Sequence, residues 1–61
     1  MLNFSKILFI SDPGKTGMLV TNTAGRRKQR SMRFQDIHAA LDWCIQSGAV
    51  LLYTPAAPIN N

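Results

Sequence analysis

Five basic side chains stand within eight consecutive positions near the middle of this 61-residue chain. They are Arg26, Arg27, Lys28, Arg30 and Arg33, and no acidic residue interrupts them. The whole chain has seven lysines and arginines against three acids, which gives a formal net charge of +4. Guanidinium groups bind phosphate oxygens in a bidentate geometry, and a concentrated positive field attracts polyanions. The cluster therefore predicts contacts with the phosphates of a nucleic acid, with Lys6 and Lys15 as secondary contacts.

The same basic segment has a second interpretation. Charges between two strands keep a protein soluble and protect a sheet edge from pairing with other chains. The segment would then steer encounter with an acidic protein surface. In that case the chain is a protein–protein interaction or assembly module, or a regulatory accessory module of the kind that phages and plasmids encode, without contact to nucleic acid. We favour nucleic acid, DNA or RNA, because five cations without a nearby acid exceed what solubility requires.

Single strands are favoured over duplexes. The sequence offers no second helix for a helix-turn-helix, whereas aromatic residues on strands can stack on unpaired bases. Tyr53 and Trp43 are the candidates for stacking or for a subunit interface. For Trp43 we favour a lid over the sheet edge or a subunit contact over base stacking. Phe9 and Phe34 are expected in the core.

Residues for catalysis or metal binding are scarce. One cysteine and one histidine cannot complete a Cys/His zinc site, and three carboxylates leave little material for general acid–base chemistry. The triplet Gly14-Lys15-Thr16 is not a P-loop, because that motif needs a glycine at the position of Phe9 and a helix afterwards. We therefore expect no catalytic residue, no metal, no cofactor and no small-molecule substrate. The chain is not expected to be an enzyme.

Turn residues and hydrophobic patterns predict the elements that hold the basic residues. Residues 4–11 and 17–23 predict the two strands of a hairpin. Asp12-Pro13-Gly14-Lys15 joins them and fits a type II turn, with Pro13 in the second position and Gly14 in the third. A basic loop then begins at Ala24-Gly25, and residues 30–34 predict a short third strand.

A helix is the most clearly encoded element. Its apolar residues follow the 3.6-residue period: Ile37, Ala40, Leu41, Cys44 and Ile45. Asp36 stands where a helix N-cap belongs, and Gly48 stands where a left-handed C-terminal residue belongs. Residues 49–54 predict a last strand, which Pro55 stops.

This order, β-β-(β)-α-β, predicts a small α+β protein with a largely antiparallel sheet of three or four strands and one helix on one face. Residues 1–55 are expected to form a single domain and residues 56–61 a flexible tail. Residues 7–10 and 50–53 are apolar at even and at odd positions, so both faces of the sheet carry apolar side chains there. The face without a helix must therefore pack against something else. A domain of this length is also marginally stable alone. We therefore expect a homodimer or a higher homo-oligomer.

The sequence also bears on location. No segment approaches the ~18–20 apolar residues that a membrane span requires, and the N-terminal residues lack the features of a secretory signal. The single cysteine, Cys44, has no disulfide partner within the chain. These features predict a cytoplasmic protein without membrane association.

Overall fold

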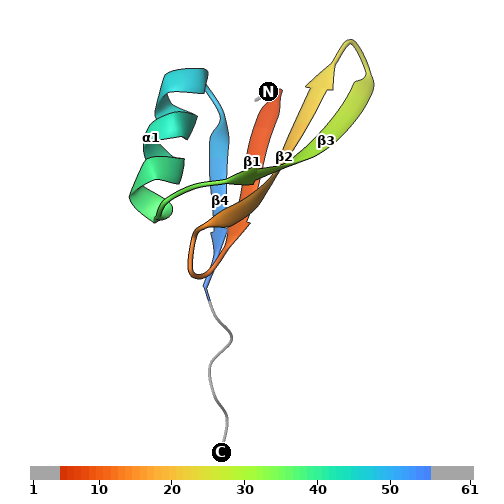
Figure 1. Cartoon of the computed structure of the whole chain (residues 1–61). Coiled ribbons are helices and arrows are strands. Elements are labelled where there is room, and N and C mark those ends of the chain that lie inside the picture. Colours follow the sequence, from red (N-terminus) through yellow and green to blue (C-terminus); the bar gives the residue numbers. More distant parts are fainter. Residues whose placement is uncertain (1–4, 56–61) are drawn as a thin grey trace, which may run out of the picture.

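The computed structural model describes residues 5–55 of the chain. Its elements are β1 (Lys6–Ser11), β2 (Thr16–Thr23), β3 (Arg26–Arg33), α1 (Ile37–Ser47) and β4 (Val50–Thr54). The four strands form one sheet in the order β3-β2-β1-β4 (Figure 1). Only β1 and β4 run parallel; the other two pairs are antiparallel. The predicted α+β fold with a mostly antiparallel sheet is confirmed. Phe4 and residues 56–61, which we expected in the first strand and in a tail, lie outside the described residues.

The β1–β2 hairpin has the predicted strands but a different turn. The N–H of Gly14 donates to the carbonyl of Ser11 at 2.7 Å, and the Asp12–Pro13 peptide bond is cis. Pro13 therefore takes the third position of the turn, so the expected type II turn is wrong. Gly14 has φ +87°, and a Cβ built there would lie 2.7 Å from the Cβ of Ile37. The start of α1 thus packs directly on this turn.

Strand β3 is longer than predicted. The basic segment is not a loop but an eight-residue strand that pairs with β2 along its whole length. The cause is a tight turn at Ala24 and Gly25, where both φ angles are positive, 53° and 78°. A two-residue turn of this kind matches the twist of antiparallel strands and needs no longer loop. Beyond the end of β1, the ends of β2 and β3 project as a two-stranded arm, hereafter the β2–β3 arm, residues 22–27 (Figure 1).

Helix α1 begins and ends where the sequence predicts. The side chain of Asp36 accepts a hydrogen bond from the N–H of Ala39 at 2.9 Å, which caps the first turn. At the other end Gly48 has φ +73°, and its N–H donates to the carbonyl of Cys44. A left-handed residue of this kind closes a helix, and glycine adopts it without steric cost. Both caps are local signals, and both are confirmed.

The buried face of α1 is turned from the predicted stripe toward Trp43. The five buried apolar side chains of the described residues are Leu8, Ile10, Leu19, Ala40 and Cys44. Leu41 and Ile45, which belong to the predicted stripe, are 44% and 70% exposed. At 100° per residue this corresponds to a rotation of about 60°. The rotation packs the large indole of Trp43 against the core and against Phe34, with 6.2 Å between the ring centroids.

The sheet face away from α1 is apolar over three strands. Adjacent partners in the register share a face, which gives two rows across β4, β1 and β2. These rows form the open face: Val50, Ile7 and Val20, then Leu52, Phe9 and Met18. Phe9, Met18 and Leu52 are 44%, 37% and 45% exposed, because none of the described elements covers them. The expectation that Phe9 is a core residue is therefore wrong for the single chain.

Candidate nucleic-acid interface

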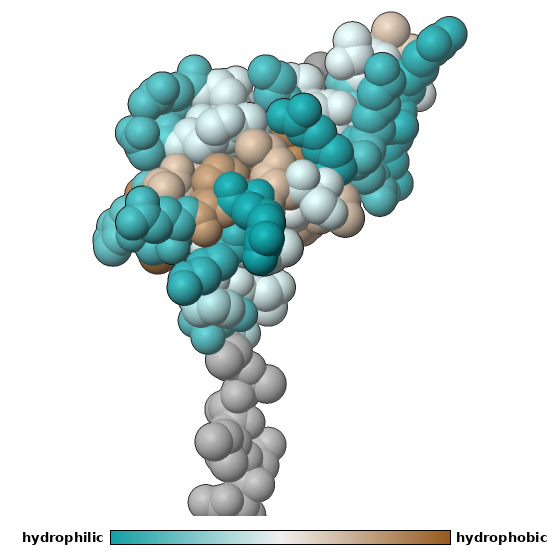
Figure 2. Space-filling view, viewed as in Figure 1, coloured by the Kyte–Doolittle hydropathy of each residue, from teal (hydrophilic) through white to brown (hydrophobic). Residues whose placement is uncertain are grey.

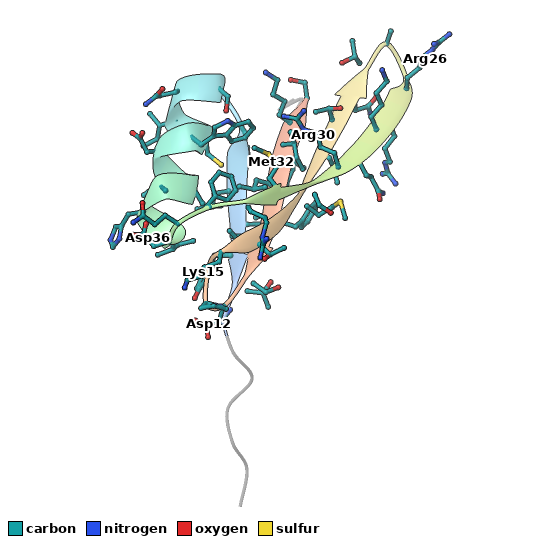
Figure 3. All side chains as sticks on the ribbon, in the orientation of Figure 1. Asp12, Lys15, Arg26, Arg30, Met32 and Asp36 are labelled. Atoms are coloured by element: carbon teal, nitrogen blue, oxygen red, sulfur yellow. The ribbon has the colours of Figure 1, made fainter. Side chains whose placement is uncertain are left out.

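The alternation of β3 divides the basic cluster between the two faces of the sheet. Side chains of a strand alternate, so Arg26, Lys28 and Arg30 share the face that α1 occupies. Arg27 and Arg33 lie on the opposite face of the sheet, beside the apolar rows of the open face. The five predicted contact residues therefore do not form one surface. Figure 3 shows Arg30 turned toward α1 and Arg26 at the far end of the β2–β3 arm.

A fourth cation joins the three on the helix side. Lys6 pairs with Thr21 across β1 and β2, and Thr21 pairs with Lys28 across β2 and β3. The three residues form one row, and strands lie about 4.8 Å apart, so the backbones of Lys6 and Lys28 are about 10 Å apart. Lys6 and Lys28 were predicted as a secondary and a primary contact, and the sheet brings them together.

These four cations border a trough between α1 and β3. Its inner part has a volume of about 430 Å³ and is lined by Lys6, Leu19, Thr21, Lys28, Gln29, Arg30 and Trp43. An outer part of about 470 Å³ is lined by Ser5, Lys6, Thr21, Thr23, Ala24, Arg26 and Lys28. Because Lys6, Thr21 and Lys28 line both parts, the two are continuous. We call this feature the basic trough.

The two walls of the inner part differ in character. Lys28 and Arg30 supply positive charge from β3, whereas Trp43 faces them from α1 and Leu19 forms an apolar floor. Figure 2 shows brown apolar surface at the centre of the molecule and teal polar surface over most of the β2–β3 arm. Apart from Lys6, whose ammonium lies at the end of α1, the inner part of the trough is therefore amphipathic across its width.

Lys6 is held at the end of α1. Its ammonium group donates to the carbonyl of Ser47 at 3.3 Å, and the Ser47 hydroxyl donates to the carbonyl of Trp43 at 2.6 Å. The carboxyl end of a helix carries a partial negative charge, so this contact is favourable. An ammonium group has three donors, and two remain for a ligand.

The three carboxylates of the chain are bound to neutral donors. Asp36 caps α1, Asp42 accepts from the side-chain amide of Gln46 at 2.8 Å, and Asp12 accepts from the Tyr53 hydroxyl at 2.7 Å. The side-chain hydrogen bonds found in residues 5–55 join no lysine or arginine to a carboxylate. Asp12 and Asp36 also lie at the end of the molecule away from Arg26 (Figure 3). Among residues 5–55, therefore, no side-chain hydrogen bond to a carboxylate neutralises the cations of the trough.

Besides Arg27 and Arg33, two more predicted site residues lie apart from the trough. Lys15 stands at the β1–β2 turn, close to Asp12 and at the opposite end of the molecule from Arg26 (Figure 3). Tyr53 lies at the end of β4, where its hydroxyl is bound to Asp12. Of the two aromatic candidates, Trp43 is the one that lines the trough together with basic residues.

The described residues offer little for other chemistry. Cys44 is 2% exposed, and burial raises the pKa of its thiol, so the thiolate that would act as a nucleophile is disfavoured. Residues 5–55 contain no group of three or more His, Cys, Asp or Glu side chains that could hold a metal ion. Nor is any helix in that range long and apolar enough to cross a membrane.

Comparison with known proteins gives no matching family model, no similar characterised protein and no similar solved structure. A signal for the trough was present in the sequence, because Arg26, Lys28 and Arg30 follow the period of two that places residues on one face of a strand. It was missed because the segment was expected to be a loop.

Proposed function

We propose that the protein is a non-enzymatic binder of single-stranded nucleic acid that contacts mainly the phosphate backbone. The observation that carries the proposal is the basic trough, where four of the seven cations of the chain line one continuous hollow. Arg27 and Arg33 add positive charge on the other side of β3. A positive groove beside an aromatic residue is the arrangement by which many proteins bind single strands without reading their sequence.

The spacing of the cations supports a single strand. Arg26, Lys28 and Arg30 stand at alternate positions of β3, so their backbones repeat about every 6.8 Å. Successive phosphates of an extended single strand repeat at a similar distance. A strand that follows β3 can thus place one phosphate near each side chain.

The test compares two variants of equal charge. One variant replaces Arg26, Lys28 and Arg30 with glutamine; the control replaces Lys15, Arg27 and Arg33, which lie outside the trough. Binding of labelled oligo(dT) and oligo(U) is followed by fluorescence anisotropy. If each phosphate contact contributes about 1 kcal/mol, the trough variant binds about 100-fold more weakly than the wild type. The control keeps most of the affinity.

Salt dependence gives a second readout. About four neutralised phosphates predict a slope of log K against log salt near −3 on single strands, and the trough variant reduces it to about −0.7. Equal weakening by both variants would show that only net charge matters. No binding by the folded wild type at low salt would remove the proposal.

A second candidate function is protein–protein interaction or assembly without nucleic acid. The open face favours it, because contiguous exposed apolar side chains on a soluble domain mark interaction surfaces. On that candidate the basic residues only steer encounter with an acidic surface. The anisotropy experiment separates the two, since negligible binding of both oligonucleotides by wild type and variants would favour the second.

We further propose that two copies, or a higher number, pack through the open face. Sheets pack face to face by interdigitating apolar side chains, and the five buried side chains of a single copy form a small core. We place the protein in the cytoplasm, which a free, buried Cys44 without a disulfide partner supports.

A further inference from the structure

We infer that the inner part of the basic trough holds one unpaired nucleotide, with its base stacked on the indole of Trp43 and its phosphate on Lys28 and Arg30. The inference rests on the proposed function and makes it specific. It assigns to Trp43 a ligand-binding role, in place of the sheet-edge lid or subunit contact that the sequence favours.

The two walls of the inner trough match the two ends of a nucleotide. A nucleotide has a flat, weakly polar base at one end and an anionic phosphate at the other. The inner trough has the same division across its width, with Trp43 and Leu19 on one side and Lys28 and Arg30 on the other. A strand whose backbone follows β3 therefore turns its bases toward α1. The inner part of the trough has a volume of about 430 Å³, which is within the range of small-ligand sites.

The indole is held in place before any ligand arrives. Phe34 packs against it at 59° with 6.2 Å between centroids, and Trp43 is half-buried against the core. The backbone carbonyl of Trp43 also accepts a hydrogen bond from the Ser47 hydroxyl, and the backbone carbonyl of Ser47 accepts one from the Lys6 ammonium. A ring already fixed by packing loses little freedom when a base stacks on it, which favours binding.

The same geometry predicts weak base selectivity. Stacking uses the π-face that every base has, and selectivity requires hydrogen bonds to base edges. Beside the Leu19 floor Thr21 supplies one hydroxyl, and the side-chain amide of the lining, Gln29, lies on β3 with the cations that bind the phosphate. We therefore expect homopolymers of different bases to bind with similar affinity.

The experiment exploits the single tryptophan of the chain. Wild-type protein is titrated with oligo(dT) and with an abasic deoxyribose-phosphate oligomer of equal length, at low salt. Oligo(dT) is expected to quench the Trp43 fluorescence and to bind about 5- to 150-fold more tightly than the abasic strand, from the usual contribution of one stacked base. An oligo(U) arm tests whether RNA binds in the same way.

Two variants complete the test. Trp43→Phe keeps an aromatic face and is expected to retain most of the preference for oligo(dT) over the abasic strand. Trp43→Leu is expected to abolish that preference. Circular dichroism checks that each variant is folded. If Trp43→Leu does not fold, the affinities of the wild-type protein for oligo(dT) and for the abasic strand still test the stacking inference.

The outcomes separate this inference from the proposed function. Equal affinity for oligo(dT) and the abasic strand, with unchanged fluorescence, would overturn the stacking inference while phosphate binding stands. Loss of binding to both strands by the folded wild type would overturn the proposed function itself.

Discussion

At the scale of single residues, the bond between Tyr53 and Asp12 links two distant parts of the chain. The Tyr53 hydroxyl donates to a carboxylate oxygen of Asp12 at 2.7 Å, 41 residues away in sequence. It joins the end of β4 to the turn between β1 and β2. The hydrogen bond to Asp12 raises the pKa of Tyr53, with smaller contributions from desolvation and from the negative charge of Asp12.

We predict that Tyr53 titrates above the ordinary tyrosine pKa of 10.0 in the folded protein. Because the folded pKa is the higher one, the bond stabilises the fold fully below pH 10 and loses this effect as the pH rises through the folded pKa. The phenolate absorbance of this only tyrosine reports the titration directly. Asp12→Ala should lower the midpoint toward the ordinary value. A wild-type midpoint at or below that of the variant would contradict the assignment.

At the scale of elements, locally encoded features were predictable and long-range ones were not. The limits of α1 follow from Asp36 and Gly48, whose capping bonds involve residues within a few positions. The rotation of α1 toward Trp43 was not predictable, because it depends on packing against β2 and Phe34. The parallel pairing of β1 with β4 joins residues 43 apart, and no local pattern encodes it.

The candidate site shows the same limit. The cluster of cations is visible in the sequence, and the period of β3 would have placed three of them on one face. Their proximity to Lys6 depends on the register of two strand pairs, and their proximity to Trp43 depends on the rotation of α1. Both are properties of the assembled sheet and helix.

The turn between β2 and β3 leads to a prediction for this element. Ala24 has φ 53°, a region in which an alanine is strained and an asparagine is tolerated. Ala24→Asn creates the Asn-Gly pair preferred in such turns and should raise the free energy of unfolding by about 0.5–1 kcal/mol. Urea denaturation measures the change.

Gly25→Ala provides the opposite control. Gly25 has φ 78°, so an alanine there should lower the free energy of unfolding by about 1–2 kcal/mol. If the two substitutions shift stability in the same direction, the turn geometry described for residues 24 and 25 is incorrect.

At the scale of the whole molecule, the open face and the basic trough lie on opposite sides of one sheet. A second copy can therefore cover the apolar side without obstructing the trough. Such packing would also bury the side chains that a single copy leaves exposed, among them Phe9 and Leu52. Burial of apolar area is the main source of stability for a domain this small.

We predict that light scattering at micromolar concentration gives a mass of at least twice the 6.8 kDa of one chain. Leu52→Lys, on the open face, should shift the protein toward the monomer, because a charge would be buried in the interface. Ile45→Lys is the matched control, since Ile45 is 70% exposed on α1 and lies outside the open face. A wild-type mass of one chain, or equal effects of both variants, would contradict assembly through this face.

At the end of the molecule away from Arg26, Asp12 and Asp36 offset the charges of Lys15 and Arg33. The uncompensated positive charge therefore lies toward the β2–β3 arm and gives the molecule an electric dipole (Figure 3). In the field of a polyanion, a dipole experiences a torque that turns its positive pole forward before any contact is made. The β2–β3 arm would therefore arrive first, and Arg26 would meet the strand ahead of the inner trough. Added salt should then slow association far more than it hastens release.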